Sequence, residues 1–117
     1  MRIWDVPVTD LCRQHLLGEH RELHGLWNIL TLGKTGYSRH PETLRWDGKL
    51  SALRHRHGAQ VYEMERRGYQ HRSHLPPPPI GHSALQLQLI NTLDEQRLLL
   101  ARKNCGCYAP APRGRDQ

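Results

Sequence analysis

An imidazole and a carboxylate at helical spacing are the first candidates for chemistry in this sequence. His15 and Glu22 lie seven residues apart, which places them two helical turns apart along nearly one line. Gly18 lies between them, and its missing side chain leaves room for a close approach. Such groups can transfer protons at a reacting centre. They can equally be surface residues of a solvated helix, in which Glu22 pairs with His15 or with Arg2.

Metal-binding side chains are the second candidates. The chain has three cysteines, at positions 12, 105 and 107, and nine histidines. The odd cysteine count and the Cys-Gly-Cys spacing match neither a zinc knuckle nor a redox pair, so reduced thiols are expected. Two groups of histidines could cluster: His15, His20 and His24, and His55, His57, His71 and His74. Neither group combines with the cysteines at a usual zinc spacing. The sequence therefore predicts no metal and no other cofactor.

The His15–Glu22 pair requires a long helix near the start of the chain. A short segment that includes a proline covers residues 1–8, after which Thr9 or Asp10 offers a side chain that can cap a helix. Apolar residues then recur at helical spacing and predict a buried stripe: Leu16, Leu23, Leu26, Trp27 and Leu30. The helix is expected to run to about Leu32, with Gly33 as its stop.

Two more helices are expected downstream, separated by prolines. Residues 42–67 carry an apolar face, with Pro41 suited to the first turn and Gly68 suited to the end. Residues 72–80 contain four consecutive prolines, which predict an extended polyproline connection. Ser83 could cap a third helix that reaches Lys103 and offers its leucines to the core. The Gly- and Pro-rich residues from 104 onward predict a frayed tail.

These elements predict an all-α protein. We expect a compact single domain of three main helices, with a polyproline connection and an N-terminal segment that crosses the first helix. The domain is expected over residues 1–103, with residues 104–117 as a C-terminal tail. A chain of 117 residues has room for one domain and a small core, so chemistry is expected on one face or in a shallow groove.

The charge of the chain favours a polyanionic partner. Seventeen lysines and arginines against eleven acidic residues give a net charge of +6, and the pI is about 9.7. No signal peptide is evident, and no segment approaches the ~20 apolar residues that span a bilayer. A cytoplasmic, nucleoid-associated monomer without a membrane partner is therefore expected.

The segment Gln14–Leu23 resembles one known family. It is similar to the first helix of the phage endonuclease V-like pyrimidine-dimer DNA glycosylases and abasic-site lyases, in their short bacterial form. The family motif has Gln-His-Leu, two further residues, Glu, an aromatic residue and then Arg-Glu-Leu, and this chain has His20 at the aromatic position. Weaker similarity covers four other stretches: Arg2-Ile3, Lys49-Leu50, Arg66 to Tyr69, and Leu93 to Glu95.

The resemblance implies a reaction and its residues. The family's N-terminal amine attacks C1′ of the sugar, displaces the 5′ base of a pyrimidine dimer and forms an iminium, after which β-elimination nicks the strand. The residue before the Arg-Ile pair supplies the amine, which implies Met1 here. Glu22 is implied as the carboxylate that stabilises the sugar cation and assists proton transfer. Four residues are implied at the DNA: Arg2, Gln14, His15 and Arg21.

The α-amine suits this role because its free pKa is about 7.7–8.0, against about 10.4 for lysine. A useful fraction is therefore neutral near pH 7 without burial. The bulk of Arg2 is expected to block removal of the initiator methionine, which leaves Met1 in register. His15 could help to hold the flipped strand, or could be a structural residue that bridges to Glu22.

The basic residues elsewhere allow further expectations. The second helix carries a face expected to follow the DNA backbone without reading sequence: Arg45, Lys49, Arg54, Arg56, Arg66 and Arg67. Gly25, Thr92 and Gln96 replace cations of the phage pattern. Three nearby cations are the expected substitutes: Arg97, Arg102 and Lys103.

The expected partner is double-stranded DNA that contains UV-induced pyrimidine dimers. Two other functions stay open from the sequence. One is a lyase or glycosylase for another DNA lesion, and the other is a non-catalytic basic helical module that binds DNA or RNA.

Overall fold

The computed structural model describes residues 2–33, 39–71, 73–78, 80–103 and 105–107. Within these ranges the chain forms helices and no strand, which confirms the all-α prediction. The elements are the 3-10 turn η1 (Val8–Asp10) and the α-helices α1 (Arg13–Leu32), α2 (Pro41–Trp46), α3 (Leu50–Arg66) and α4 (Leu93–Arg102). No helix of the described part is both long and apolar enough to cross a membrane.

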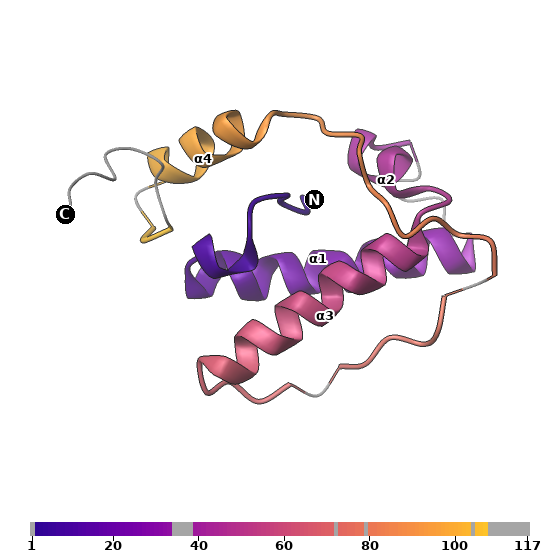
Figure 1. The fold of residues 1–117 in the computed structure, drawn as a ribbon, viewed down its shortest axis with the longest axis horizontal. Helices are drawn as coiled ribbons and strands as arrows, with labels where there is room; N and C mark the ends of the chain where they lie inside the picture. Colours follow the sequence, from indigo (N-terminus) through magenta and orange to yellow (C-terminus); the bar gives the residue numbers. More distant parts are fainter. Residues whose placement is uncertain (1, 34–38, 72, 79, 104, 108–117) are drawn as a thin grey trace.

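The body of the domain is the pair of long helices α1 and α3, which pack against each other (Figure 1). Leu23, Leu26 and Trp27 of the predicted α1 stripe enter one core cluster with Trp46 of α2 and Leu53 of α3. A second cluster lies around the start of α1, where the stripe residue Leu16 packs with Met64 of α3 and Leu100 of α4. The predicted stripe is thus confirmed, with Leu30 half-buried.

The ends of α1 differ in how well the sequence predicted them. Gly33 ends the helix as predicted, because its φ of 65° is left-handed and a helix cannot continue through it. The predicted N-cap is wrong, since Thr9 and Asp10 lie within η1 and α1 begins only at Arg13. The turn is held from outside by Arg67, whose Nη2 donates to the Leu11 carbonyl at 2.6 Å.

The predicted second helix is two helices. Gly48 has a φ of 75° and separates α2 from α3, because the left-handed conformation interrupts a right-handed helix. His82, far along the chain, caps the start of α3: its Nδ1 accepts a hydrogen bond from the Leu50 N–H at 3.1 Å.

The predicted third helix is wrong over its first half. α4 begins at Leu93 behind a capping box of Thr92 and Glu95, not at Ser83. The backbone of Ser83 bonds to another part of the chain instead, because its N–H donates to the Gly48 carbonyl at 2.9 Å. Of the leucines expected to reach the core, Leu100 is buried, and six others are exposed: Leu85, Leu87, Leu89, Leu93, Leu98 and Leu99.

The two ends of the domain meet at the start of α1. The extended residues 2–7 cross α1, as predicted, and they do so on the side where α4 lies (Figure 1). The start of the expected tail is not frayed, since Cys107 packs on the second core cluster and its Sγ accepts from the Cys12 N–H at 3.0 Å. Asn104 and residues 108–117 lie outside the described residues.

Candidate active site

Buried carboxylates hold the extended N-terminal segment. The segment has no neighbouring strand, so its backbone groups need other partners. The N–H of Ile3 donates to Oε2 of Glu42 on α2 at 2.7 Å, and the N–H of Trp4 donates to Oε1 of Glu19 on α1 at 2.9 Å. Both carboxylates are almost fully buried, at 1% and 2% exposure. They therefore fix the segment that carries the N-terminus against two helices.

Each of these carboxylates is paired with an arginine that was expected to face DNA. Arg45 donates from Nε to Oε1 of Glu42 at 2.8 Å and from Nη2 to the Ile3 carbonyl at 2.8 Å. Arg56 donates from Nε to Oε2 of Glu19 at 2.7 Å. Burial acts to lower the pKa of Arg45, but the hydrogen bonds to Glu42 and the charges of Glu42 and Asp5 together outweigh burial and raise this pKa. The prediction of a DNA-facing role is wrong for Arg45 and Arg56, because their charges neutralise buried carboxylates.

A glutamine of α4 completes the support of the N-terminal segment. Gln96 is fully buried, and its Oε1 accepts from the Asp5 N–H at 2.7 Å. Its Nε2 donates to Oδ2 of Asp5 at 3.0 Å. Gln96, which replaces a cation of the phage pattern, is therefore a structural residue in this chain.

A groove of about 320 Å³ lies where this segment meets α1. Its lining includes every predicted site residue that the structure describes: Arg2, Gln14, His15, Arg21 and Glu22. The volume is at the low end of the roughly 300–1,000 Å³ typical of small-ligand sites. Met1, the expected nucleophile, lies outside the described residues.

Four other residues line the groove. Gly18 lies between His15 and Glu22 as expected, and Lys103 is the expected substitute cation that reaches the groove. Trp4 and Glu19 also line it and were not predicted. Glu19 carries a signal that could have found it, since it lies three residues after Leu16 and four before Leu23, at a core position of the helical stripe.

The charges of the groove are arranged around an exposed carboxylate. Glu22 and Arg21 are exposed on α1, and neither forms an ion pair with a described residue. Arg2 lies over the Trp4 ring, with its guanidinium carbon 4.5 Å from the ring centroid, and burial lowers its pKa while Glu42 acts in the opposite direction. The groove therefore presents cationic groups beside Glu22.

In the described part of the chain, no hydrogen bond or ion pair joins His15 to Glu22. Its Nδ1 instead faces the sulfur atoms of three cysteines, at 3.2 to 3.4 Å. Burial, followed by the nearby charge of Lys103, lowers the pKa of His15. A neutral His15 is therefore favoured at pH 7.

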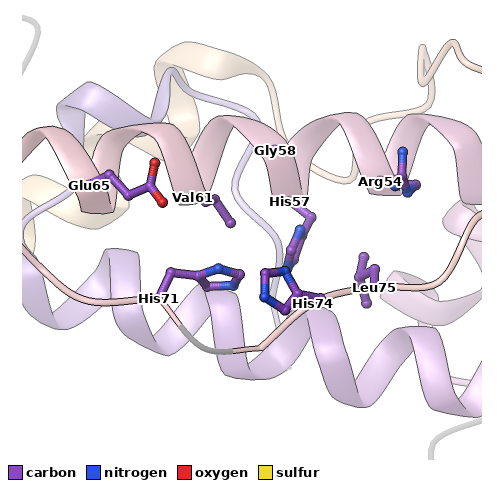
Figure 2. A pocket seen from close by; sticks show the side chains of 8 residues that line it. All are labelled: Arg54, His57, Gly58, Val61, Glu65, His71, His74 and Leu75. Atoms are coloured by element: carbon purple, nitrogen blue, oxygen red, sulfur yellow. The ribbon is translucent and has the colours of Figure 1, made fainter.

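A second hollow, of about 300 Å³, lies between α3 and three residues that follow it, His71, His74 and Leu75. His57 of α3 points toward His71 and His74 there (Figure 2). The two expected histidine groups are recombined, and four of their members meet: His20, His24, His57 and His71. His55 is exposed and lies neither with these four histidines nor with His15 and its three cysteines.

The fold and the groove define an all-α protein with a cationic groove around an exposed carboxylate. A family model described as pyrimidine dimer DNA glycosylase matches residues 1–77, which include α1, α2 and α3. The chain therefore belongs to the pyrimidine dimer DNA glycosylase family, a DNA repair family, as its first helix predicted. Comparison with curated proteins gave no match, and comparison with solved structures gave none either.

Proposed function

We propose that this chain acts on UV-induced pyrimidine dimers as a glycosylase and cuts the resulting abasic site as a β-elimination lyase. The α-amine of Met1 is the nucleophile, and Glu22 is the catalytic carboxylate. One observation carries the proposal: Arg2 and the α1 residues Gln14, Arg21 and Glu22 line a single groove in a member of a glycosylase family.

The reaction requires an amine that attacks C1′ and a carboxylate that lies near the same carbon. The amine nitrogen attacks C1′, and the C1′–base bond breaks with its electron pair on the departing base. The C1′–O4′ bond then opens as the iminium forms. Loss of a C2′ proton finally expels the 3′ phosphate. A carboxylate near C1′ stabilises the cationic sugar and accepts or returns protons. We assign this role to Glu22, which has no competing ion pair with a described residue.

The support of residues 3–5 explains how the amine can be held. Two residues separate the amine from the Ile3 N–H, which is hydrogen-bonded to Glu42. An extended chain spans at most about 3.6 Å per residue, so the amine stays within about 7 Å of this fixed point. Arg2, which is bonded to Met1, lines the same groove as Glu22.

Cations of the groove are assigned to the DNA backbone. Arg2, Arg21 and Lys103 can contact phosphates, while Gln14 and His15 lie beside them. A dimer is poorly stacked in the duplex, which lowers the cost of extruding the base opposite it. The substrate of the proposal is therefore double-stranded DNA with such a lesion.

Borohydride trapping tests the nucleophile. Intact-mass measurement first establishes that the purified chain begins with Met1. Borohydride should then link the chain covalently to irradiated duplex and to abasic duplex. A variant with extra residues before Met1 displaces the amine by about 3.3 Å or more per residue. Its trapping and nicking should collapse while DNA binding persists. Unchanged trapping would assign the nucleophile to a lysine such as Lys34 or Lys49.

The carboxylate is tested separately. Glu22→Gln should abolish dimer cleavage and retain some imine formation on abasic DNA, because an aldehyde requires no base to be displaced. Glu65→Gln is the matched control, since Glu65 is an exposed helical glutamate outside the groove. Full dimer cleavage by Glu22→Gln would refute the assignment.

The two alternatives give different patterns in the same assays. Trapping of the unaltered chain on abasic DNA alone would limit the activity to a lyase. Binding of DNA without trapping on either substrate would favour the non-catalytic module.

A further inference from the structure

All three cysteines of the chain meet at His15. Cys12 directly precedes α1, and His15 lies in the first turn of that helix, whereas Cys105 and Cys107 follow α4. The Nδ1 atom of His15 lies 3.2 Å from Sγ of Cys12, 3.2 Å from Sγ of Cys105 and 3.4 Å from Sγ of Cys107. The four atoms all lie within 4.8 Å of one another.

Hydrogen bonding does not account for this arrangement. An imidazole nitrogen carries either one hydrogen or one lone pair, so Nδ1 can serve one thiol and not three. The cysteines are free and not joined in disulfides. A tetrahedral zinc ion, with Zn–S bonds of about 2.3 Å and Zn–N bonds of about 2.0–2.1 Å, would separate sulfur from nitrogen by about 3.5 Å. The observed separations of 3.2 to 3.4 Å are close to this value.

We propose that Cys12, His15, Cys105 and Cys107 bind one Zn²⁺ ion. Three thiolates and one imidazole form the closed tetrahedral set of a structural zinc site, with no position left for water or substrate. Gly106 provides the turn between the two cysteines, since its φ of 97° is a conformation that other residues rarely adopt. The proposal replaces the expectation that this protein binds no metal, and it does not depend on the proposed glycosylase activity.

The site would anchor one wall of the groove. A zinc ion would tie residues 105–107 to the first turn of α1, where His15 lines the groove. Lys103, two residues before Cys105, lines the same groove and would be held there. α4 buries few apolar side chains, because Leu98 and Leu99 are exposed, so a metal link adds a second attachment to a small core.

Elemental analysis of the full chain tests this site. The Cys105→Ser/Cys107→Ser variant should lose about one equivalent of zinc relative to the unaltered protein. His55→Gln is the matched control and should lose none, since His55 is exposed and outside both clusters. An equal zinc content in the cysteine variant would overturn the proposal.

A second measurement uses the unaltered chain and so does not depend on whether a variant folds. Zinc should protect all three thiols from alkylation, and a chelator should make them reactive. Cobalt in place of zinc should give a thiolate-to-metal charge-transfer absorption. Alkylation that is indifferent to zinc, or a cobalt spectrum without this absorption, would overturn the proposal.

An independent observation concerns the four histidines between α1 and α3. His20 donates from Nδ1 to Oε1 of Gln60 at 3.0 Å, because the Gln60 amide Nε2 donates to the Glu19 carboxylate and leaves its oxygen for His20. The Nε2 of His20 therefore carries a lone pair. This atom is buried and has no hydrogen-bond partner, and the same holds for Nε2 of His71.

The other two histidines approach each other through the same ring atom. Nε2 of His24 and Nε2 of His57 lie 3.2 Å apart, close to the roughly 3.3 Å between nitrogens of a tetrahedral zinc site. One ligand nitrogen from each of the four rings lies within 4.8 Å of the others.

The geometry points to a second divalent ion, bound by His20, His24, His57 and His71. The hydrogen bonds that link His20 to Gln60 and Gln60 to Glu19 would orient the His20 ring toward the ion, as carboxylates and amides commonly do behind metal-bound imidazoles. Because Glu19 also accepts from the Trp4 N–H, this ion would be linked to the segment that carries the N-terminus.

Zinc is the probe for the histidine site as well. The His24→Gln/His57→Gln variant should lose about one equivalent of zinc yet keep the cobalt–thiolate absorption. The cysteine variant should also lose about one equivalent of zinc, and it should lack this absorption. In the unaltered chain, zinc added after chelation should shift the Nε2 resonances of the four histidines. A full zinc content in the histidine variant, or unshifted Nε2 resonances, would overturn this second site.

Discussion

Replacement of Arg45 by methionine tests whether a buried ion pair holds the N-terminal segment. Arg45 is 1% exposed and donates to Glu42, to Asp5 and to the carbonyls of Ile3 and Gln88. Methionine fills much of the same space but leaves the Glu42 carboxylate buried without its cation. The variant therefore removes the charge of Arg45 and its hydrogen bonds while keeping most of its packing.

The expected loss of stability is large. Removal of one partner from a buried ion pair costs about 3–5 kcal/mol, because the remaining charge stays desolvated. A domain of this kind is stable by roughly 5–15 kcal/mol, so the change removes about a fifth or more of its free energy of unfolding. The midpoint of thermal unfolding should fall by about 10–20 °C.

Denaturant unfolding and amide hydrogen exchange measure the two consequences. The free energy of unfolding should fall, and the Ile3 amide should lose protection because its acceptor is no longer fixed. Arg39→Met is the matched control, since Arg39 is exposed and forms no ion pair with a described residue. Its unfolding free energy should change by less than about 0.5 kcal/mol.

The double variant Glu42→Gln/Arg45→Met gives the sharpest result. It should be more stable than Arg45→Met alone, because the unpaired buried charge is gone. The reasoning is refuted if Arg45→Met unfolds within about 1 kcal/mol of the unaltered chain, or if the double variant is the less stable of the two.

Three further predictions concern other parts of the molecule. Hydrogen bonds from Arg66, and then from Arg67, lower the pKa of Glu63 from 4.5 to about 2. A carboxyl group with a lowered pKa stabilises the fold at a pH above its unfolded pKa. This stabilisation is lost as the pH falls from 4.5 toward 2. Glu63→Gln should therefore lower the unfolding free energy by about 1–2 kcal/mol at pH 7, after allowance for the exposed Arg66, and by little near pH 2. Equal losses at both pH values in denaturant titrations would contradict this prediction. If DNA binding neutralises about five phosphates, log K should fall with log salt at a slope of about −4.5. Arg21→Ala should weaken binding and reduce that slope by about 0.9 in fluorescence anisotropy titrations, and an unchanged slope would remove Arg21 from the interface. Thr92→Ala should cost about 1 kcal/mol in thermal unfolding because the α4 capping box is lost, whereas Thr92→Ser should be nearly neutral.

The sequence predicted those features that depend on neighbouring residues. The stripe from Leu16 to Trp27 sets the buried face of α1, and Gly33 ends the helix through its own backbone conformation. The motif around Glu22 identified the family, because its residues lie within one helix and keep their spacing in any fold that contains it. Periodicity failed for residues 83–92, where leucines two positions apart occur in an extended, exposed segment and not in a helix.

Only the tertiary structure decided which polar groups are buried together. Glu19, His20, His57 and Gln60 occupy core positions of α1 and α3, a pattern visible in the sequence, but their partners lie 37 or more positions away or on another element. A buried polar group is stable only with a matching partner, and local spacing does not name that partner. The groove likewise depends on contacts between distant parts of the chain. The sequence by itself placed Glu22 and Arg21 on α1, whereas chain crossing brought Arg2 and Lys103 beside them. It also brought the distant Cys105 and Cys107 to His15 and its neighbour Cys12.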